Sequence, residues 1–407
     1  MAGVMKPSDG RHWRSRLRLS VAGLMMLVLI IGGWLGRVVN SARVQREAVA
    51  AIRAAGGRVL YEWEVKNGQW KPTGKPWWPN WVVDRIGVDY LGSVLHADLG
   101  PEGTNAELAH AARLRRLEEL ELPHSRVTDA GLAQVRSLWY LRVLNLNDTA
   151  VTDAGLAHLK GMDSLQTLWL ERTPITDAGL AHLSEVYGLR CLRLGETKVG
   201  DAGLAALEGL GLMEVLWLQK TRVGDAGLRH IEQLTLLRDL NLADTAVSDA
   251  ELARLAALRD LETLNLNKTR VTDAGMPSLK GLAGLEKLYL SGDKVTGAGL
   301  EHLVGLTDLH LAGTPIRDDG LAHLAGLKRL RVLELNGAAI TDAGLAHLPG
   351  LTNLEELSLQ AAEITDAGLR PLAGLTLLKL LDLTNTKVTD DGMDAIQQAV
   401  PGVRFFP

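Results

Sequence analysis

The sequence predicts an α/β solenoid, built from stacked coils of one strand, one turn and one short helix, behind a single transmembrane helix. The first observation is a tetrad based on Asp, Ala, Gly and Leu that returns every 24 residues from Asp129 to Asp273. Leucines alternate between the tetrads, as in LQTLWLERTPIT at 165–176. An uncharged apolar run at 19–36 is the third observation. A coil of this kind buries its apolar stripe only by stacking on its neighbours.

The N-terminal segment predicts a basic cytoplasmic tail at 1–18 and a transmembrane signal anchor at 19–39. Five basic residues precede the apolar run, and fewer follow it closely. A helix of about 20 residues spans a hydrocarbon core of roughly 30 Å. The charge bias places the N-terminus in the cytoplasm and the rest of this single-pass chain on the exported side, periplasmic or extracellular. The alternative is a signal peptide, with small residues at 39–42 for cleavage and a secreted product.

Residues 40–93 are expected to form a juxtamembrane helix and a Trp- and Pro-rich N-terminal cap region. The segment 41–57 is typical of a helix that ends at its two glycines, and RVLYEWEV after it is typical of a strand. The loop WKPTGKPWWPNW at 70–81 has two interpretations. It packs onto the open end of the solenoid, or its aromatic side chains contact a partner or a lipid interface.

Residues 94–407 are expected to hold the repeats, about twelve full coils with a degenerate first coil and a C-terminal cap strand. Leucines two positions apart face the same side of a strand, and the residues between them face the other side. After the turn, Thr176 caps the following helix and Asp177 complements its dipole. Each coil is therefore a strand, a turn and a short helix.

These coils resemble leucine-rich repeats, specifically the TDAGL type of 24-residue repeat in bacterial membrane-anchored proteins, which is also similar to the repeats beside F-box motifs. The resemblance covers about residues 94–407. It implies a right-handed, horseshoe-shaped solenoid in which a parallel sheet lines the concave face and helices cover the convex face. Thr holds the position that is usually Asn, except at Asp293, Ala338 and Ala362, where we expect looser turns. A role in ubiquitin ligation is not expected behind a membrane anchor.

One column of residues on the concave face is a candidate binding surface. Trp169, Arg193 and Trp217 occupy the same place in three successive strands, so they should lie roughly 4.8 Å apart and form a cation-π stack. Clustered Trp, Tyr and Arg are typical of binding hot spots. Mutual shielding of the aromatic rings is the alternative. The candidate ligand-binding residues are Trp169, Arg193, Trp217, Tyr289, His310, Val215 and Cys191.

Several kinds of chemistry are not expected. A net charge of -4 and a pI near 6.3 give no basic field for nucleic acid. One cysteine allows no intrachain disulfide and no multi-cysteine metal site. His310, Glu334 and Ser358 are the residue types of a hydrolytic triad, but the acid lies between the other two. We therefore expect no catalytic residue, no metal and no cofactor.

The sequence thus predicts a non-enzymatic protein-protein interaction scaffold or receptor-like module, which binds a protein partner on the concave face of an exported solenoid. The lipid bilayer is its second partner, through residues 19–39. The alternative function is a carbohydrate or cell-wall binding module that uses exposed Trp residues. A structural spacer is a third interpretation, and the ligand and the oligomeric state stay open.

Overall fold

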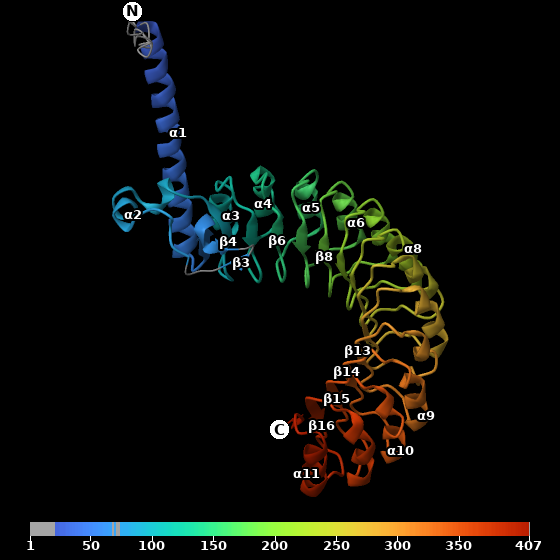
Figure 1. Cartoon of the computed structure of the whole chain (residues 1–407). Coiled ribbons are helices and arrows are strands. Elements are labelled where there is room, and N and C mark those ends of the chain that lie inside the picture. The colour runs from blue at the N-terminus through green and yellow to red at the C-terminus, as the bar shows by residue number, and fades with distance from the viewer. Residues whose placement is uncertain (1–20, 67–68, 71–73, 407) are drawn as a thin grey trace, which may run out of the picture.

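The computed structural model describes residues 21–66, 69–70 and 74–406 (Figure 1). The basic tail at 1–18, the start of the predicted anchor and part of the Trp- and Pro-rich loop lie outside these residues. The strands are β1 (Arg58–Tyr61), β2 (Val65–Lys66), β3 (Gln69–Trp70), β4 (Val94–Asp98), β5 (Glu119–Glu121), β6 (Val143–Asn145), β7 (Thr167–Trp169), β8 (Cys191–Arg193), β9 (Val215–Trp217), β10 (Asp239–Asn241), β11 (Thr263–Asn265), β12 (Lys287–Tyr289), β13 (Asp308–His310), β14 (Val332–Glu334), β15 (Glu356–Ser358), β16 (Leu380–Asp382) and β17 (Arg404–Phe405). The α-helices are α1 (Val21–Ala54), α2 (Asn80–Ile86), α3 (Asn105–Ala111), α4 (Asp129–Leu132), α5 (Asp153–Leu156), α6 (Asp177–Leu180), α7 (Asp201–Leu204), α8 (Asp225–Ile231), α9 (Asp318–Leu321), α10 (Asp342–Leu345) and α11 (Asp390–Ala399).

The coils form the solenoid that the repeats predict. A single sheet of fifteen strands runs in chain order from β1 through β4 to β17, and β2 and β3 form a separate pair. From β4 onward the neighbouring strands are parallel, whereas β1 is antiparallel to β4. Figure 1 shows the strands on the inner side of an arc and the helices on its outer side. Short 3₁₀ turns extend or replace the α-helix in most coils.

Leucine burial holds each coil together. In the coil that begins with β7, Leu168 and Leu170 on the strand side and Leu180 and Leu183 on the helix side are all fully buried. Full burial of a leucine side chain contributes about 2 kcal/mol. The strand residues on either side of Leu168 are only half-buried, because they face the concave surface.

The turn after each strand is closed by a hydrogen bond within the coil. The hydroxyl of Thr149 donates to the carbonyl of Leu146 over 2.7 Å. The threonines at the same position of most other coils form the same bond. We expected looser turns at Asp293, Ala338 and Ala362, and this expectation is wrong. The backbone N–H of Asp293 donates to the carbonyl of Leu290 over 3.1 Å. Both alanines are buried, and their backbone N–H groups still donate to the carbonyl three residues earlier, over 3.1 and 3.0 Å. The backbone bond keeps the turn closed without the hydroxyl.

A ladder of carboxylates joins most coils to the next. Asp153 accepts hydrogen bonds from the backbone N–H of Thr176 over 2.8 Å and from its hydroxyl over 2.6 Å. A Cβ at Gly179 would lie 2.3 Å from the Asp153 Oδ1 atom, which explains the glycine of the tetrad. The same two bonds join Asp129 to Thr152, Asp225 to Ser248, Asp249 to Thr272, Asp273 to Thr296, Asp318 to Thr341, Asp342 to Thr365 and Asp366 to Thr389.

The N-terminal end of the solenoid is covered by α1. This helix is continuous, so the expected juxtamembrane helix is the second half of the same element. Its residues Ala48 and Ile52 are fully buried against the first coil, and β1 then pairs with β4. At the other end, β17 adds a final parallel strand.

The described part of the Trp- and Pro-rich loop does not cover the solenoid, so the packing interpretation is wrong for it. Trp77 is 77% exposed and Trp81 is 71% exposed. The cover comes from α1 and β1 instead, because their apolar side chains already fill the end of the first coil.

The first half of α1 is apolar and open. From Gly23 onward the helix is long and apolar enough to cross a membrane, and its most apolar window has no buried residue. A signal sequence has the same length and composition, so α1 is a candidate for either a membrane anchor or a signal sequence.

Candidate binding site on the concave face

The predicted aromatic stack is present on three adjacent strands. Trp169 on β7 is paired in register with Arg193 on β8, and Arg193 with Trp217 on β9. The Cζ atom of Arg193 lies 4.6 Å from the ring centroid of Trp169 and 3.8 Å from that of Trp217. All three side chains are half-buried, because each covers part of its neighbour. We call this cluster the Trp-Arg stack.

Strand alternation explains the orientation of the Trp-Arg stack. The middle residues of β7, β8 and β9 are leucines that are fully buried in the solenoid. Side chains on both sides of a buried strand residue point to the opposite face. Cys191 and Val215 lie beside the stack for the same reason, and they are also in register with each other.

The stack places a positive charge between aromatic rings with no carboxylate in direct ion-pair contact. Arg193 forms no ion pair within the described part of the chain, and its Nε atom is buried without a hydrogen-bond partner there. The indole Nε1 atoms of Trp169 and Trp217 are also buried, and they favour the charged forms of the neighbouring Cys191 thiol and Asp239 carboxyl, respectively. Cation-π contact compensates the charge of the half-buried guanidinium only in part.

Asp239 borders the stack and was not predicted. It pairs in register with Val215 on the neighbouring strand. Burial raises the pKa of its carboxyl, while the indole of Trp217 and the charge of Arg193 act in the opposite direction. Burial also raises the pKa of the Cys191 thiol, which disfavours the reactive thiolate form. The sequence feature that could have identified Asp239 is its position: it is the first residue of its strand, as Val215 is the first residue of the preceding strand.

The other side of the stack is a fixed polar edge. The amide of Gln219 donates to the carboxylate of Glu171 over 2.8 Å, across the intervening coil. A Cβ at Gly195 would lie 2.2 Å from the Gln219 Nε2 atom, so only glycine leaves room for this bond. Asn147 donates to the second oxygen of Glu171 over 3.0 Å. The apolar stack therefore has one rigid polar border.

Tyr289 and His310 form a second cluster. Their rings stack with centroids 4.4 Å apart and an interplanar angle of 12°. Strands β10 and β11 separate this pair from the Trp-Arg stack, so the structure does not join the seven predicted residues into one patch. The gap of three strand spacings is about 14 Å.

The residues beyond His310 do not form a hydrolytic triad. His310 Nδ1 lies 2.6 Å from Glu334 Oε2. Ser358 donates instead to Asn336 over 2.6 Å and contacts Asp382 at 3.1 Å. The acid thus separates the histidine from the hydroxyl, as the order of the strands predicts. A cavity of about 250 Å³ lies over this network. Across the described residues, no group of three or more His, Cys, Asp or Glu could hold a metal ion.

Comparisons with known proteins support the fold. A family model described as "Leucine Rich repeat" matches residues 350–373 and 374–396. An internalin from Listeria monocytogenes is similar in structure, with a TM-score of 0.55 and 21% identity over 80% of this chain and 92% of that chain. A leucine-rich repeat protein from Leptospira interrogans has a TM-score of 0.57 and 20% identity, over 74% of each chain. No curated protein matches the chain significantly.

The two family matches and the two structural neighbours together support a leucine-rich repeat protein. Nothing in the site or in these comparisons points to a catalytic activity.

Proposed function

We propose that this protein is a non-enzymatic protein-protein interaction module that binds its partner on the concave face, at the Trp-Arg stack. The observation that carries the proposal is the guanidinium of Arg193, which lies between two indole rings and makes no direct ion pair in the described chain, with the carboxyl of Asp239 at the border of the stack. Leucine-rich repeat solenoids present extended concave surfaces suited to binding. The partner we expect offers an apolar side chain to the rings and a carbonyl or carboxylate oxygen to Arg193.

Photocrosslinking of the full chain in envelope preparations tests this site. A photoreactive residue at Val215 borders the stack without replacing it, and one at Arg229 on the outer helix α8 is the matched control. We expect a specific protein adduct from position 215 and none from position 229. Trp169→Ala with Trp217→Ala should reduce the adduct about 30-fold, which corresponds to about 2 kcal/mol for a hot-spot pair.

The double variant needs a folding control, because both indoles are half-buried. Far-UV circular dichroism should show unchanged strand and helix content, since the strand leucines stay in place. An equal adduct from wild type and the folded double variant would refute the site. A glycan array that binds wild type, with no protein adduct, would favour the carbohydrate alternative, and no binding of either kind would favour a structural spacer.

We further propose that α1 anchors the protein in a membrane with the solenoid on the exported side. The apolar half of α1 is exposed, while its second half is buried against the first coil. Cleavage within 39–42 would cut the helix near Ala42, which is itself buried. The mass of the mature protein tests this proposal: an intact chain that floats with vesicles supports the anchor, and a chain that begins after residue 42 refutes it.

A further inference from the structure

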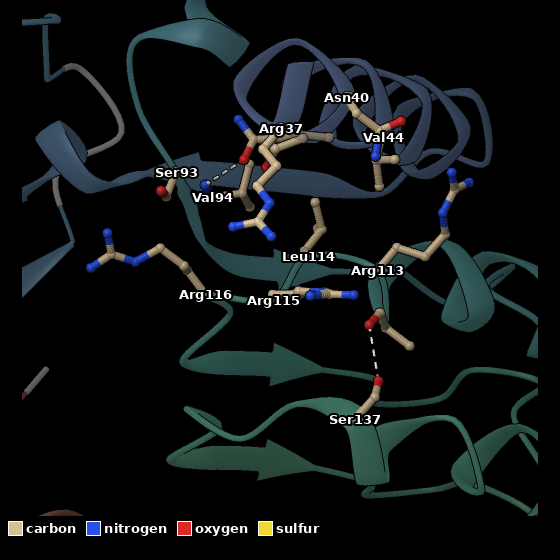
Figure 2. Close-up of a pocket in the computed structure, with 13 residues that line it drawn as sticks. Arg37, Asn40, Val44, Ser93, Val94, Arg113, Leu114, Arg115, Arg116 and Ser137 are labelled. Atoms are coloured by element: carbon tan, nitrogen blue, oxygen red, sulfur yellow. Dashed lines mark hydrogen bonds between the residues drawn. The ribbon is translucent and has the colours of Figure 1, made fainter. Parts of the chain in front are cut away.

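A cavity of about 790 Å³ lies between α1 and the first coils (Figure 2). Its upper wall is the middle of α1, with Arg37, Asn40 and Val44. Its lower wall is the turn after α3, with Arg115 and Arg116. The strands follow one another in chain order, so the Trp-Arg stack on β7 to β9 and the network around Glu334 on β14 both lie away from this end of the solenoid. The concave-face proposal therefore gives this cavity no role.

The cavity is positively charged because three of the four arginines that line it have no partner in the described chain. Arg113, which also lines it, forms an ion pair with Glu47 at 3.1 Å. No side-chain hydrogen bond or ion pair within the described parts of the chain involves Arg37, Arg115 or Arg116. Figure 2 shows the guanidinium of Arg37 pointing from α1 toward the coil, with Arg115 beneath it and Arg116 directed away to one side.

The backbone fixes the two arginines in this arrangement. Leu114 is 4% exposed and packs in the core, which holds the turn in place and leaves the next side chain outside. The hydroxyl of Ser137 donates to the carbonyl of Ala112 over 3.0 Å and ties the same turn to the following coil. Arg115 is thus presented by an ordered turn, and Arg37 by a helix.

The cavity lies beside the part of α1 that directly follows the apolar run. The large side chains of α1 from Leu24 to Leu35 are exposed hydrophobic groups, and Arg37 follows them within one turn. In an anchored protein this arginine lies at the level of the lipid headgroups, since about 20 residues span the hydrocarbon core. Helix α2, which carries the exposed Trp81, lies near the same end of the molecule as α1 (Figure 1), and tryptophan is enriched at membrane interfaces.

We propose that this cavity binds the phosphate group of an anionic phospholipid, with Arg37 and Arg115 as the contacting residues and Arg116 at the rim. Arginine binds phosphate through paired N–H donors, and the two guanidiniums approach the cavity from opposite walls. A basic pocket beside a membrane helix is suited to a lipid headgroup. This inference depends on the proposed anchor, but not on the concave-face partner.

Native mass spectrometry of the full chain tests the proposal. The protein in a zwitterionic detergent is mixed with equal amounts of phosphatidylglycerol and phosphatidylcholine. We expect wild type to retain phosphatidylglycerol about fivefold or more over phosphatidylcholine, and Arg37→Gln with Arg115→Gln to lose this preference. Arg222→Gln with Arg270→Gln removes the same charge from two exposed positions in later coils, and this variant should keep the preference for phosphatidylglycerol.

Three outcomes would overturn the proposal. Equal retention of the two lipids by wild type overturns it, as does a preference that survives in the cavity variant. Binding of inorganic phosphate alone, lost in the cavity variant but without lipid preference, assigns the cavity to a soluble phosphate compound and overturns the lipid assignment. Flotation with phosphatidylcholine vesicles reports the anchor separately, and the crosslink at position 215 reports the concave face.

Discussion

Asp293 is a buried carboxyl group in a position that most other coils give to threonine. It is 2% exposed. Its Oδ1 atom accepts hydrogen bonds from the backbone N–H of Thr269 over 2.6 Å and from its hydroxyl over 3.2 Å, whereas Oδ2 is buried without a partner in the described chain. Burial raises the pKa of Asp293 to about 7, although the two bonds from Thr269 oppose this effect. The fold therefore disfavours the ionised form.

The sign of the pH effect follows from proton binding. An unfolded aspartate has a pKa of about 3.9, so between pH 4 and about 7 the folded chain binds more protons at this site than the unfolded chain. The free energy of unfolding must then decrease as the pH rises through this window, and level off above it. Each pKa unit corresponds to about 1.4 kcal/mol, which gives roughly 2 to 4 kcal/mol, the lower value if the coil relaxes around the charge.

Asp293→Asn isolates this contribution, because it keeps a carbonyl oxygen for Thr269 and removes the charge. Urea unfolding of the full chain in detergent, followed by circular dichroism between pH 5 and pH 8, gives the free energies. Wild type should lose about 2 kcal/mol or more over this range relative to the variant. The pH dependence is the test rather than the absolute stability, since the new amide N–H₂ is buried where Oδ2 was.

The matched control is Asp260→Asn, at an exposed carboxylate of the same solenoid. It should follow the wild-type pH dependence. Parallel losses of stability in wild type and Asp293→Asn would refute the reasoning, because they would show that Asp293 ionises as easily in the folded chain as in the unfolded one.

Three other substitutions or reactions test separate features. Asp153→Ala removes both bonds to Thr176 and should lower the free energy of unfolding by about 1.5 to 3 kcal/mol; an unchanged urea midpoint would contradict the ladder. Gly195→Ala displaces Gln219 and should weaken the crosslink at the concave face with little change in melting temperature, whereas a full-strength crosslink would show that the polar edge is dispensable. Cys191, whose thiol pKa is raised by burial, should react with iodoacetamide about tenfold more slowly in the folded chain than in urea, and equal rates would contradict this environment.

The repeated part of the molecule could be predicted because its period fixes the register. Once Leu168 and the leucines 24 residues on either side are assigned to the core, the neighbouring Trp169 must point outward and meet Arg193 across the strand spacing. No knowledge of the turn or helix is needed for this step. The stack was therefore predictable to the level of its contacts.

The links between coils were less predictable, because they depend on how one coil sits above another. Asp177 was expected to complement a helix dipole, and only the observed stacking shows that it also accepts a hydrogen bond from the backbone N–H of Gly200 in the next coil. Asp239 was missed for a different reason. It has no counterpart in the strands next to it, so no repeated pattern marked it. The sheet shows that a single unrepeated residue can change the charge at the border of the stack.

The region before the repeats was the least predictable, because it has no period at all. Its structure has a functional consequence: α1 continues without a break from the apolar run into the core of the first coil, where Ala48 and Ile52 are fully buried. A helix that is packed at one end transmits its orientation, whereas a flexible linker would not. If α1 crosses a membrane, the concave face is held at a fixed angle to it, and β7 lies about three strand spacings, or about 14 Å, beyond β4. A partner that binds the Trp-Arg stack would then approach from a fixed direction relative to the bilayer, and the proposed headgroup cavity beside the middle of α1 would stabilise the same orientation.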